Sequence, residues 1–102
     1  MREIVSSEVA DLVRGDRLVV VDCYAPWCAP CRALKPMLED FSRRFGDVTF
    51  VALNIDSCPE FTTEHGIRSI PTLLFYRSGE VVRTLTGVPS ESVLREKIEE
   101  CL

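Results

Sequence analysis

The sequence contains no apolar run long enough to cross a membrane. Its longest, Leu18 to Val21, falls far short of the roughly 20 residues that a spanning helix requires. It also lacks a cluster of Lys and Arg, and its net charge of -4 argues against nucleic acid as the primary ligand. The first residues turn acidic before any apolar segment begins, unlike a secretory leader. These absences predict a soluble cytoplasmic protein that binds neither nucleic acid nor a membrane.

Repeats, low-complexity tracts and Pro/Gly/Ser-rich linkers are also missing, so the 102 residues predict one domain spanning residues 1–102. A domain of this size buries about two-thirds of its unfolded surface and folds without crosslinks. The five cysteines are therefore available for chemistry.

Four segments carry strand signals. Residues 18–24 are apolar on both alternating sides, which predicts a central strand covered on both faces. Residues 48–55 form a second apolar strand. Residues 72–77 and 80–86 are joined by Ser78-Gly79, a tight-turn signal that predicts an antiparallel pair. Helical segments between the strands predict an α/β fold, a mixed sheet sandwiched by helices.

Two helices are predicted in the first half of the chain. Ser6 or Ser7 caps a short one, which Gly15 ends in the left-handed conformation. The other precedes Gly46 and is expected to kink at Pro36. Its apolar face is formed by Leu34, Leu38, Phe41 and Phe45.

Two more helices are predicted in the second half. Ser57 and Glu60 have the spacing of a capping box, and Gly66 closes the short helix that they begin. Ser90 caps the last helix. The apolar stripe of that helix is formed by Leu94, Ile98 and Cys101.

Only Cys28 and Cys31 have a diagnostic spacing, and they stand between a strand and a helix. Side chains three apart within a helix have Cβ atoms about 5 to 6 Å apart, whereas a disulfide needs about 3.5 to 4.5 Å. Cys28 is therefore expected at the helix entrance, a place that also suits Pro30. Free amides and the helix dipole there lower the pKa of Cys28 and make it a nucleophile, while Cys31 stays protonated until a base helps it.

Other uses of the pair are less well supported. A zinc site needs four ligands, and the remaining cysteines and His65 form no second closely spaced pair. Covalent haem needs His after the second cysteine, where Arg32 stands. Asp22, in an otherwise apolar strand, is either a base with a raised pKa that takes the proton of Cys31 or a strand-end Asp bonded to backbone.

Residues 21–31, which read Val-Asp-Cys-Tyr-Ala-Pro-Trp-Cys-Ala-Pro-Cys, closely resemble the thioredoxin family, as do Pro36, residues 54–56, residues 66–72 with their Ile-Pro-Thr, and Gly87. The resemblance runs almost end to end. It implies a thioredoxin fold, a central five-stranded mixed β-sheet flanked by four α-helices, with the cysteine pair at the carboxyl edge of a central strand.

The resemblance also implies roles for other residues. Pro71 is expected to follow a cis peptide bond and to lie beside the cysteines, so that the preceding backbone pairs with an extended substrate chain. Residues expected to bind substrate are Trp27, Ala29, Pro30, Ile70, Pro71 and Gly87. For Trp27, ordinary packing is the competing interpretation.

Some positions depart from the family pattern. Ala29 replaces the usual Gly between the cysteines, where the reduction potential is tuned. Tyr24 stands where Trp is common, and Ala52 stands where many relatives place a Lys, a loss expected to raise the pKa of Asp22 further. Three cysteines are additional, and Cys23 and Cys101 are expected to be inert apolar residues. Cys58, near an expected exposed helix start, is the better candidate for regulatory oxidation or intermolecular crosslinking, with an inert thiol as the favoured alternative.

The predicted function is that of a dithiol-disulfide oxidoreductase that reduces protein disulfides through a mixed disulfide. Cys28 attacks, Cys31 resolves and Asp22 transfers the proton. The resemblance implies a monomer that binds no metal or cofactor, that takes electrons from NADPH through thioredoxin reductase, and that serves electron transport and cell redox homeostasis. Alternatives are a more oxidising disulfide isomerase or oxidase, and a redox-inert subunit that binds a partner through a thioredoxin-like surface.

Overall fold

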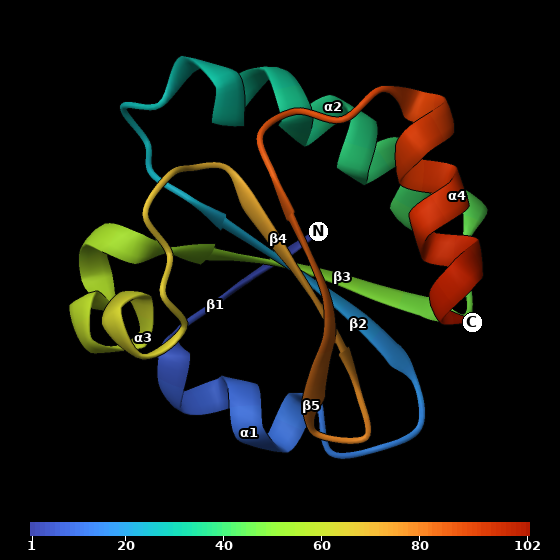
Figure 1. Cartoon of the computed structure of the whole chain (residues 1–102), viewed down its shortest axis with the longest axis horizontal. Coiled ribbons are helices and arrows are strands. Elements are labelled where there is room, and N and C mark those ends of the chain that lie inside the picture. The colour runs from blue at the N-terminus through green and yellow to red at the C-terminus, as the bar shows by residue number, and fades with distance from the viewer.

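The computed structural model describes residues 1–102, and five strands form one mixed sheet at its centre (Figure 1). The strands are β1 (Arg2–Ile4), β2 (Leu18–Tyr24), β3 (Val48–Asn54), β4 (Thr72–Arg77) and β5 (Glu80–Thr86), in the spatial order β1-β3-β2-β4-β5. Strands β1, β3 and β2 are parallel, and β4 and β5 run antiparallel to their neighbours. The predicted central strand is therefore confirmed, as are the antiparallel pair and the mixed sheet.

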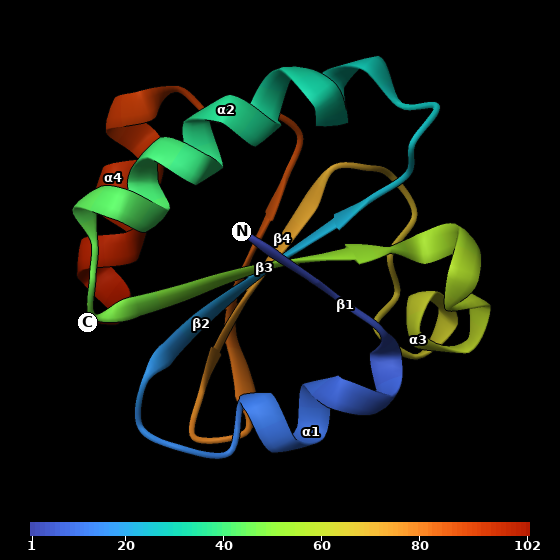
Figure 2. The same ribbon diagram turned by 180° about the vertical axis from the view of Figure 1, so that it is seen from behind.

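Four α-helices cover the two faces of the sheet. They are α1 (Val9–Leu12), α2 (Ala29–Arg44), α3 (Pro59–Glu64) and α4 (Glu91–Cys101), with short 3-10 turns at Ser6–Glu8 and Ile55–Ser57. Helices α2 and α4 lie on one side of the sheet, and α1 and α3 on the other (Figures 1 and 2). None of these helices combines the length and the apolar character that crossing a bilayer requires.

Alternating side chains of β2 divide the apolar core into two layers. Val19, Val21 and Cys23 pack toward α1 and α3. Leu18 and Val20 pack toward α2 and α4. The layer beneath α2 and α4 is closed by Leu34, Leu38, Phe41, Leu94 and Ile98, each wholly buried. Asp22 is the next residue along β2 after Leu18 and Val20 whose side chain lies on the α2 side of the sheet. It is the residue of this strand that contributes to the candidate site.

The start of the chain differs from its prediction. The first strand, β1, was not predicted, because three residues are too few to show an alternating pattern. Neither Ser6 nor Ser7 caps the following helix; Glu8 instead accepts a hydrogen bond at 2.9 Å from the amide of Val5. Gly15 does not adopt the left-handed conformation, so the predicted helix stop was wrong.

Of the other turn and helix-capping signals in the sequence, some predicted the structure correctly and one did not. Ser78 and Gly79 both have positive φ, at 52° and 83°, as the hairpin turn requires. Ser90 caps α4 by accepting from the amide of Val93 at 3.2 Å, as predicted. The predicted capping box at Ser57 was wrong, because Ser57 lies in a 3-10 turn and Cys58 occupies the N-cap of α3 without a side-chain bond.

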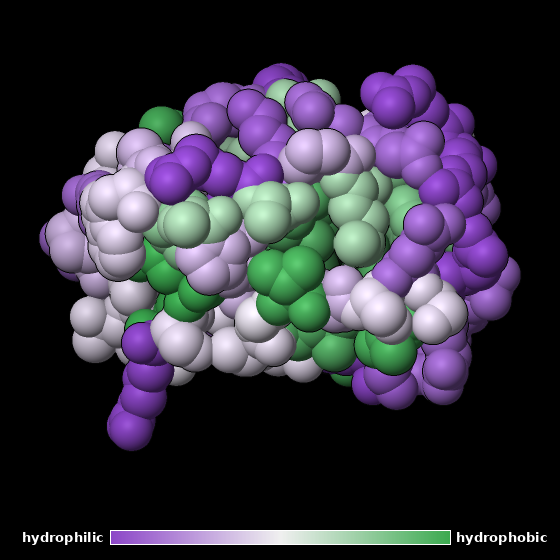
Figure 3. Space-filling model, turned by 90° about the horizontal axis from the view of Figure 1, so that it is seen from above, coloured by the Kyte–Doolittle hydropathy of each residue, from purple (hydrophilic) through white to green (hydrophobic).

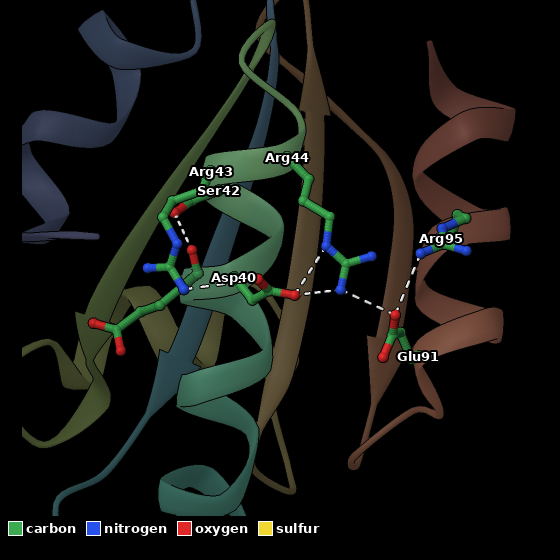
Figure 4. Close-up of polar contacts among 7 residues, drawn as sticks. Asp40, Ser42, Arg43, Arg44, Glu91 and Arg95 are labelled. Carbon is green, nitrogen blue, oxygen red and sulfur yellow. Dashed lines mark hydrogen bonds and ion pairs between the residues drawn. The ribbon is translucent and has the colours of Figure 1, made fainter.

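Ion pairs join α2 to α4 on the outer surface (Figure 4). Arg44 of α2 donates both to Asp40 on its own helix and, at 3.0 Å, to Glu91 of α4. Arg95 donates to the same Glu91 oxygen at 3.3 Å. The hydrogen bond from Arg44 lowers the pKa of Asp40. Because these charges are exposed, the ion pairs contribute little to the stability of the fold.

Candidate functional site

The cysteine pair lies at the start of α2, shortly after the end of β2, and Cys28 occupies the N-cap position of the helix. Cys28 has extended backbone angles, φ -88° and ψ 110°, and Ala29 and Pro30 occupy the first helical turn, where a missing amide hydrogen is tolerated. Cys31, one turn inside the helix, is joined to Cys28 by a disulfide with the Cα atoms 5.3 Å apart. The amide of Cys31 donates to Cys28 Sγ at 3.2 Å. The predicted placement of Cys28 at the helix entrance is therefore confirmed.

The loop before β4 approaches the pair from the side. The carbonyl oxygen of Ile70 lies 3.9 Å from Cys28 Sγ. The Ile70–Pro71 peptide bond is cis, as the family resemblance implied. The amide of Gly87 donates to the carbonyl oxygen of Pro71 at 2.8 Å, and Gly87 has a φ of 87° that other residues rarely adopt. The segment before β4 thus contacts Cys28 through Ile70 and is itself held by Gly87 through Pro71.

Around the buried sulfurs lies an exposed apolar surface. Cys28 and Cys31 are only 5% and 3% exposed, but Trp27 is 67% exposed and Val88 is 46% exposed. Figure 3 looks onto this end of the molecule and shows hydrophobic and near-neutral residues across its middle, with hydrophilic residues crowded at one side. The indole Nε1 of Trp27 donates to Asp56 Oδ2 at 3.0 Å, which fixes the ring in place. Its exposure excludes ordinary core packing, the competing interpretation of Trp27.

Asp22 is buried on the same side of the sheet as α2. It is 3% exposed, and its Oδ1 has no hydrogen-bond partner. This excludes the alternative prediction, in which Asp22 is a strand-end residue hydrogen-bonded to the backbone. Burial raises the pKa of Asp22 to about 7, the nearby charge of Glu3 raises it as well, and Lys35 opposes the shift. The predicted rise is confirmed.

A cavity of about 210 Å³ connects Asp22 with the inner cysteine. The residues that matter in its lining are Asp22, Cys31, Glu3, Tyr24, Lys35 and Ala52. The small side chain of Ala52 leaves this space open beside the carboxyl group. A carboxyl and a thiol that share one cavity can exchange a proton directly or through water.

The three other cysteines are free, and none of them lines the cavity beside Asp22. Cys23 is wholly buried, and burial raises the pKa of its thiol to about 12, so it stays an inert thiol. Cys101 packs against the layer beneath α2 and α4. Cys58 was expected near an exposed helix start, but it is only 5% exposed, which corrects that prediction: its neighbours in the core shield it.

Sequence patterns missed some residues of the site. Glu3 escaped notice because β1 was not predicted. The phenol of Tyr24 donates to Glu3 Oε1 at 2.6 Å, a contact between residues 21 positions apart that no local pattern encodes. Asp56 was noted only as part of a motif, with no partner assigned.

Comparisons with known proteins agree with this geometry. The family model described as Thioredoxin matches residues 2–100. The chain is 41% identical over 91 residues to a thioredoxin of Alicyclobacillus acidocaldarius, covering 88% of this chain and 87% of that protein. It is 39% identical over 82 residues to Thioredoxin-1 of Schizosaccharomyces pombe, covering 80% of each. The solved structure of Fasciola hepatica thioredoxin superposes over 100% of both chains with a TM-score of 0.93 and 30% identity.

Proposed function

This chain belongs to the thioredoxin family of thiol-disulfide oxidoreductases. From that premise we propose which role each of its residues has in the reduction of protein disulfides. Cys28 is the attacking thiolate, Cys31 is the resolving thiol, and Asp22 is the base that takes the proton of Cys31. One observation carries the proposal: Cys28 occupies the N-cap of α2 with an amide donated to its sulfur, and Cys31 shares a cavity with a buried carboxyl group.

The first step is attack by Cys28 on a disulfide of another protein. The thiolate forms a bond to one substrate sulfur, and the other substrate sulfur leaves as a thiolate that takes a proton from solvent. The amide of Cys31 and the positive end of the α2 dipole stabilise the negative charge on Cys28 before the attack. The product is a mixed disulfide between Cys28 and the substrate.

The second step releases the substrate. Cys31 transfers its proton to Asp22 and attacks the sulfur of Cys28. The substrate sulfur bonded to Cys28 leaves as a thiolate that takes up a proton, and the Cys28–Cys31 disulfide remains. Asp22 suits this role because burial raises its pKa to about 7, within reach of a thiol's proton near neutral pH. Two electrons pass from the cysteine pair to the substrate.

The substrate is an extended segment of a disulfide-containing protein. We expect its backbone to lie against the backbone of Ile70 beside Cys28, next to Pro71 and Gly87. Trp27 offers apolar contact area on one side. Ala29 and Pro30, exposed in the first turn of α2, complete the surface that touches the substrate.

The oxidised protein needs a source of electrons. We propose that a thioredoxin reductase drawing on NADPH reduces the disulfide, that the chain works as a monomer of one domain over residues 1–102, and that it serves electron transport in the cytoplasm. The chain is not expected to hold a cofactor of its own. A redox-inert binding subunit and a more oxidising isomerase are not favoured, because the similar proteins are thioredoxins and the cysteine pair is close.

Reduction of insulin disulfides, coupled to NADPH and an added thioredoxin reductase, tests the proposal. The protein should turn over, Cys28→Ser should show no activity, and Cys31→Ser should accumulate a mixed disulfide through Cys28. Cys58→Ser, which alters a buried cysteine outside the pair, is the matched control and should retain activity. Activity that persists in Cys28→Ser would refute the assignment.

A further inference from the structure

Two side chains of opposite charge flank the cavity beside Asp22, and the exchange steps above use neither. Glu3 lies on β1 and Lys35 lies on α2, and both line the cavity. They approach Asp22 from different elements. The carboxyl group of Asp22 therefore shares its cavity with one negatively and one positively charged side chain.

The sheet register brings Glu3 close to Asp22. Both residues pair with Ala52, which lies on β3 between their strands. Residues in register on neighbouring parallel strands point to the same face, and two strand spacings place the Cα atoms roughly 10 Å apart. Because Ala52 is small, no bulky side chain fills the gap between the two carboxyl groups.

Tyr24 holds Glu3 in place. Its hydroxyl donates to Glu3 Oε1 at 2.6 Å, a length typical of a hydrogen bond to an ionised carboxylate. Burial and the bond to Glu3 raise the pKa of Tyr24 to about 12, so the phenol remains a donor at neutral pH. This bond holds the Glu3 carboxyl group at the rim of the cavity.

Lys35 lies four residues after Cys31, which places it one helical turn further along the same face of α2. Other lining residues that carry a charged or titratable group are Arg32, Met1 with its amino terminus, and Cys31 itself. The residues that pair with Asp22 on β3 and β4, Ala52 and Leu73, carry no charge.

We propose that Glu3 and Lys35 are positioning residues for the resolving step, whose opposite charges set how tightly Asp22 holds the proton that it takes from Cys31. The proposal rests on the role assigned to Asp22 above. The effect of each charge on Asp22 has the expected sign, because the negative Glu3 raises the pKa of Asp22 and the positive Lys35 lowers it. Glu3 makes Asp22 a better base for the thiol, and Lys35 helps the proton to leave afterwards.

The test compares Glu3→Gln with Lys35→Gln, because each removes a charge and keeps nearly the same shape. The titration of the Asp22 carboxyl is followed by carbon-13 NMR in the oxidised protein, and the pH profile is recorded for single-turnover reduction of a disulfide peptide. Glu3→Gln should move both midpoints to lower pH by about 0.3 to 1.2, the range that Coulomb's law gives at roughly 10 Å. Lys35→Gln should move both to higher pH.

Two controls separate a charge effect from a structural one. Glu99→Gln removes an exposed charge on α4 and should leave the midpoints unchanged. Both shifts should shrink in about 1 M salt, which screens exposed charges but would not relieve a packing defect.

Unchanged titration and pH-profile midpoints in Glu3→Gln and Lys35→Gln would overturn this proposal. Midpoint shifts of the same sign in the two variants would also overturn it. Asp22→Asn tests the underlying role separately, because it should abolish the limb of the pH profile that Asp22 controls. A limb that survives in Asp22→Asn would refute the role of Asp22 as the base, and the proposal with it. A limb lost in Asp22→Asn but unmoved in the other two variants would refute this proposal alone.

Discussion

Replacing Asp22 by Asn should stabilise the oxidised protein, by an amount that depends on pH. The folded chain buries this carboxyl and raises its pKa from 3.8 to about 7. Each pH unit of that difference corresponds to about 1.4 kcal/mol, so the ionised form destabilises the fold by about 4 kcal/mol relative to a neutral side chain. The amide of Asn has nearly the same shape and never ionises.

The sign follows from proton binding. Below 3.8 the carboxyl is protonated in both the folded and the unfolded chain and contributes no pH dependence. Between 3.8 and about 7 the unfolded chain has released this proton and the folded chain has kept it, so the free energy of unfolding falls as the pH rises. Above about 7 the full destabilisation is present. The advantage of Asp22→Asn should therefore grow across this interval and then level off.

Urea unfolding of both oxidised proteins, from about pH 3 to about pH 8.5, measures this difference. The exposed Asp16 supplies the control, because Asp16→Asn should show no such growth with pH. An Asp22→Asn advantage that is the same at every pH would refute the reasoning, since it would mean that Asp22 titrates alike in the folded and unfolded chains.

Three further changes test other parts of the account. Cys31→Ser should convert a single turnover with a disulfide peptide into a stable mixed disulfide, visible as added mass, and full release of the peptide would contradict the resolving role. Ser90→Ala removes the N-cap of α4 and should lower the free energy of unfolding by about 1 kcal/mol, whereas Ser6→Ala, which caps nothing, should leave it nearly unchanged in the same denaturation assay. Gly79→Ala should cost about 1 to 2 kcal/mol because of its φ of 83°, while Gly15→Ala should not; equal effects would contradict the turn assignment.

The sequence predicted the central strand and the cysteine pair well because their signals are local. The segment from Leu18 to Tyr24 is apolar on both sides, and that pattern alone marks a strand buried on both faces. The position of Cys28 at the helix entrance followed from the distance that a disulfide can span. These features depend on residues that are neighbours in the chain.

Features that depend on distant residues were harder to predict. The cis bond before Pro71 came only from the family resemblance, because about 5 to 6% of X-Pro bonds are cis and no local pattern selects them. The burial of Cys58 depends on packing against other elements. The proximity of Glu3 to Asp22 depends on the register of three strands, the first of which has too few residues to be recognised.

The most direct test of the central claim is the reactivity of Cys28 in the reduced Cys31→Ser protein. Alkylation by iodoacetamide is followed against pH, and peptide mass mapping identifies the modified cysteine. If the start of α2 stabilises the thiolate, Cys28 should react well below the pH at which a cysteine in the urea-unfolded chain reacts, and ahead of the buried Cys23 and Cys58. A Cys28 that reacts only at the pH of the unfolded chain would contradict the account.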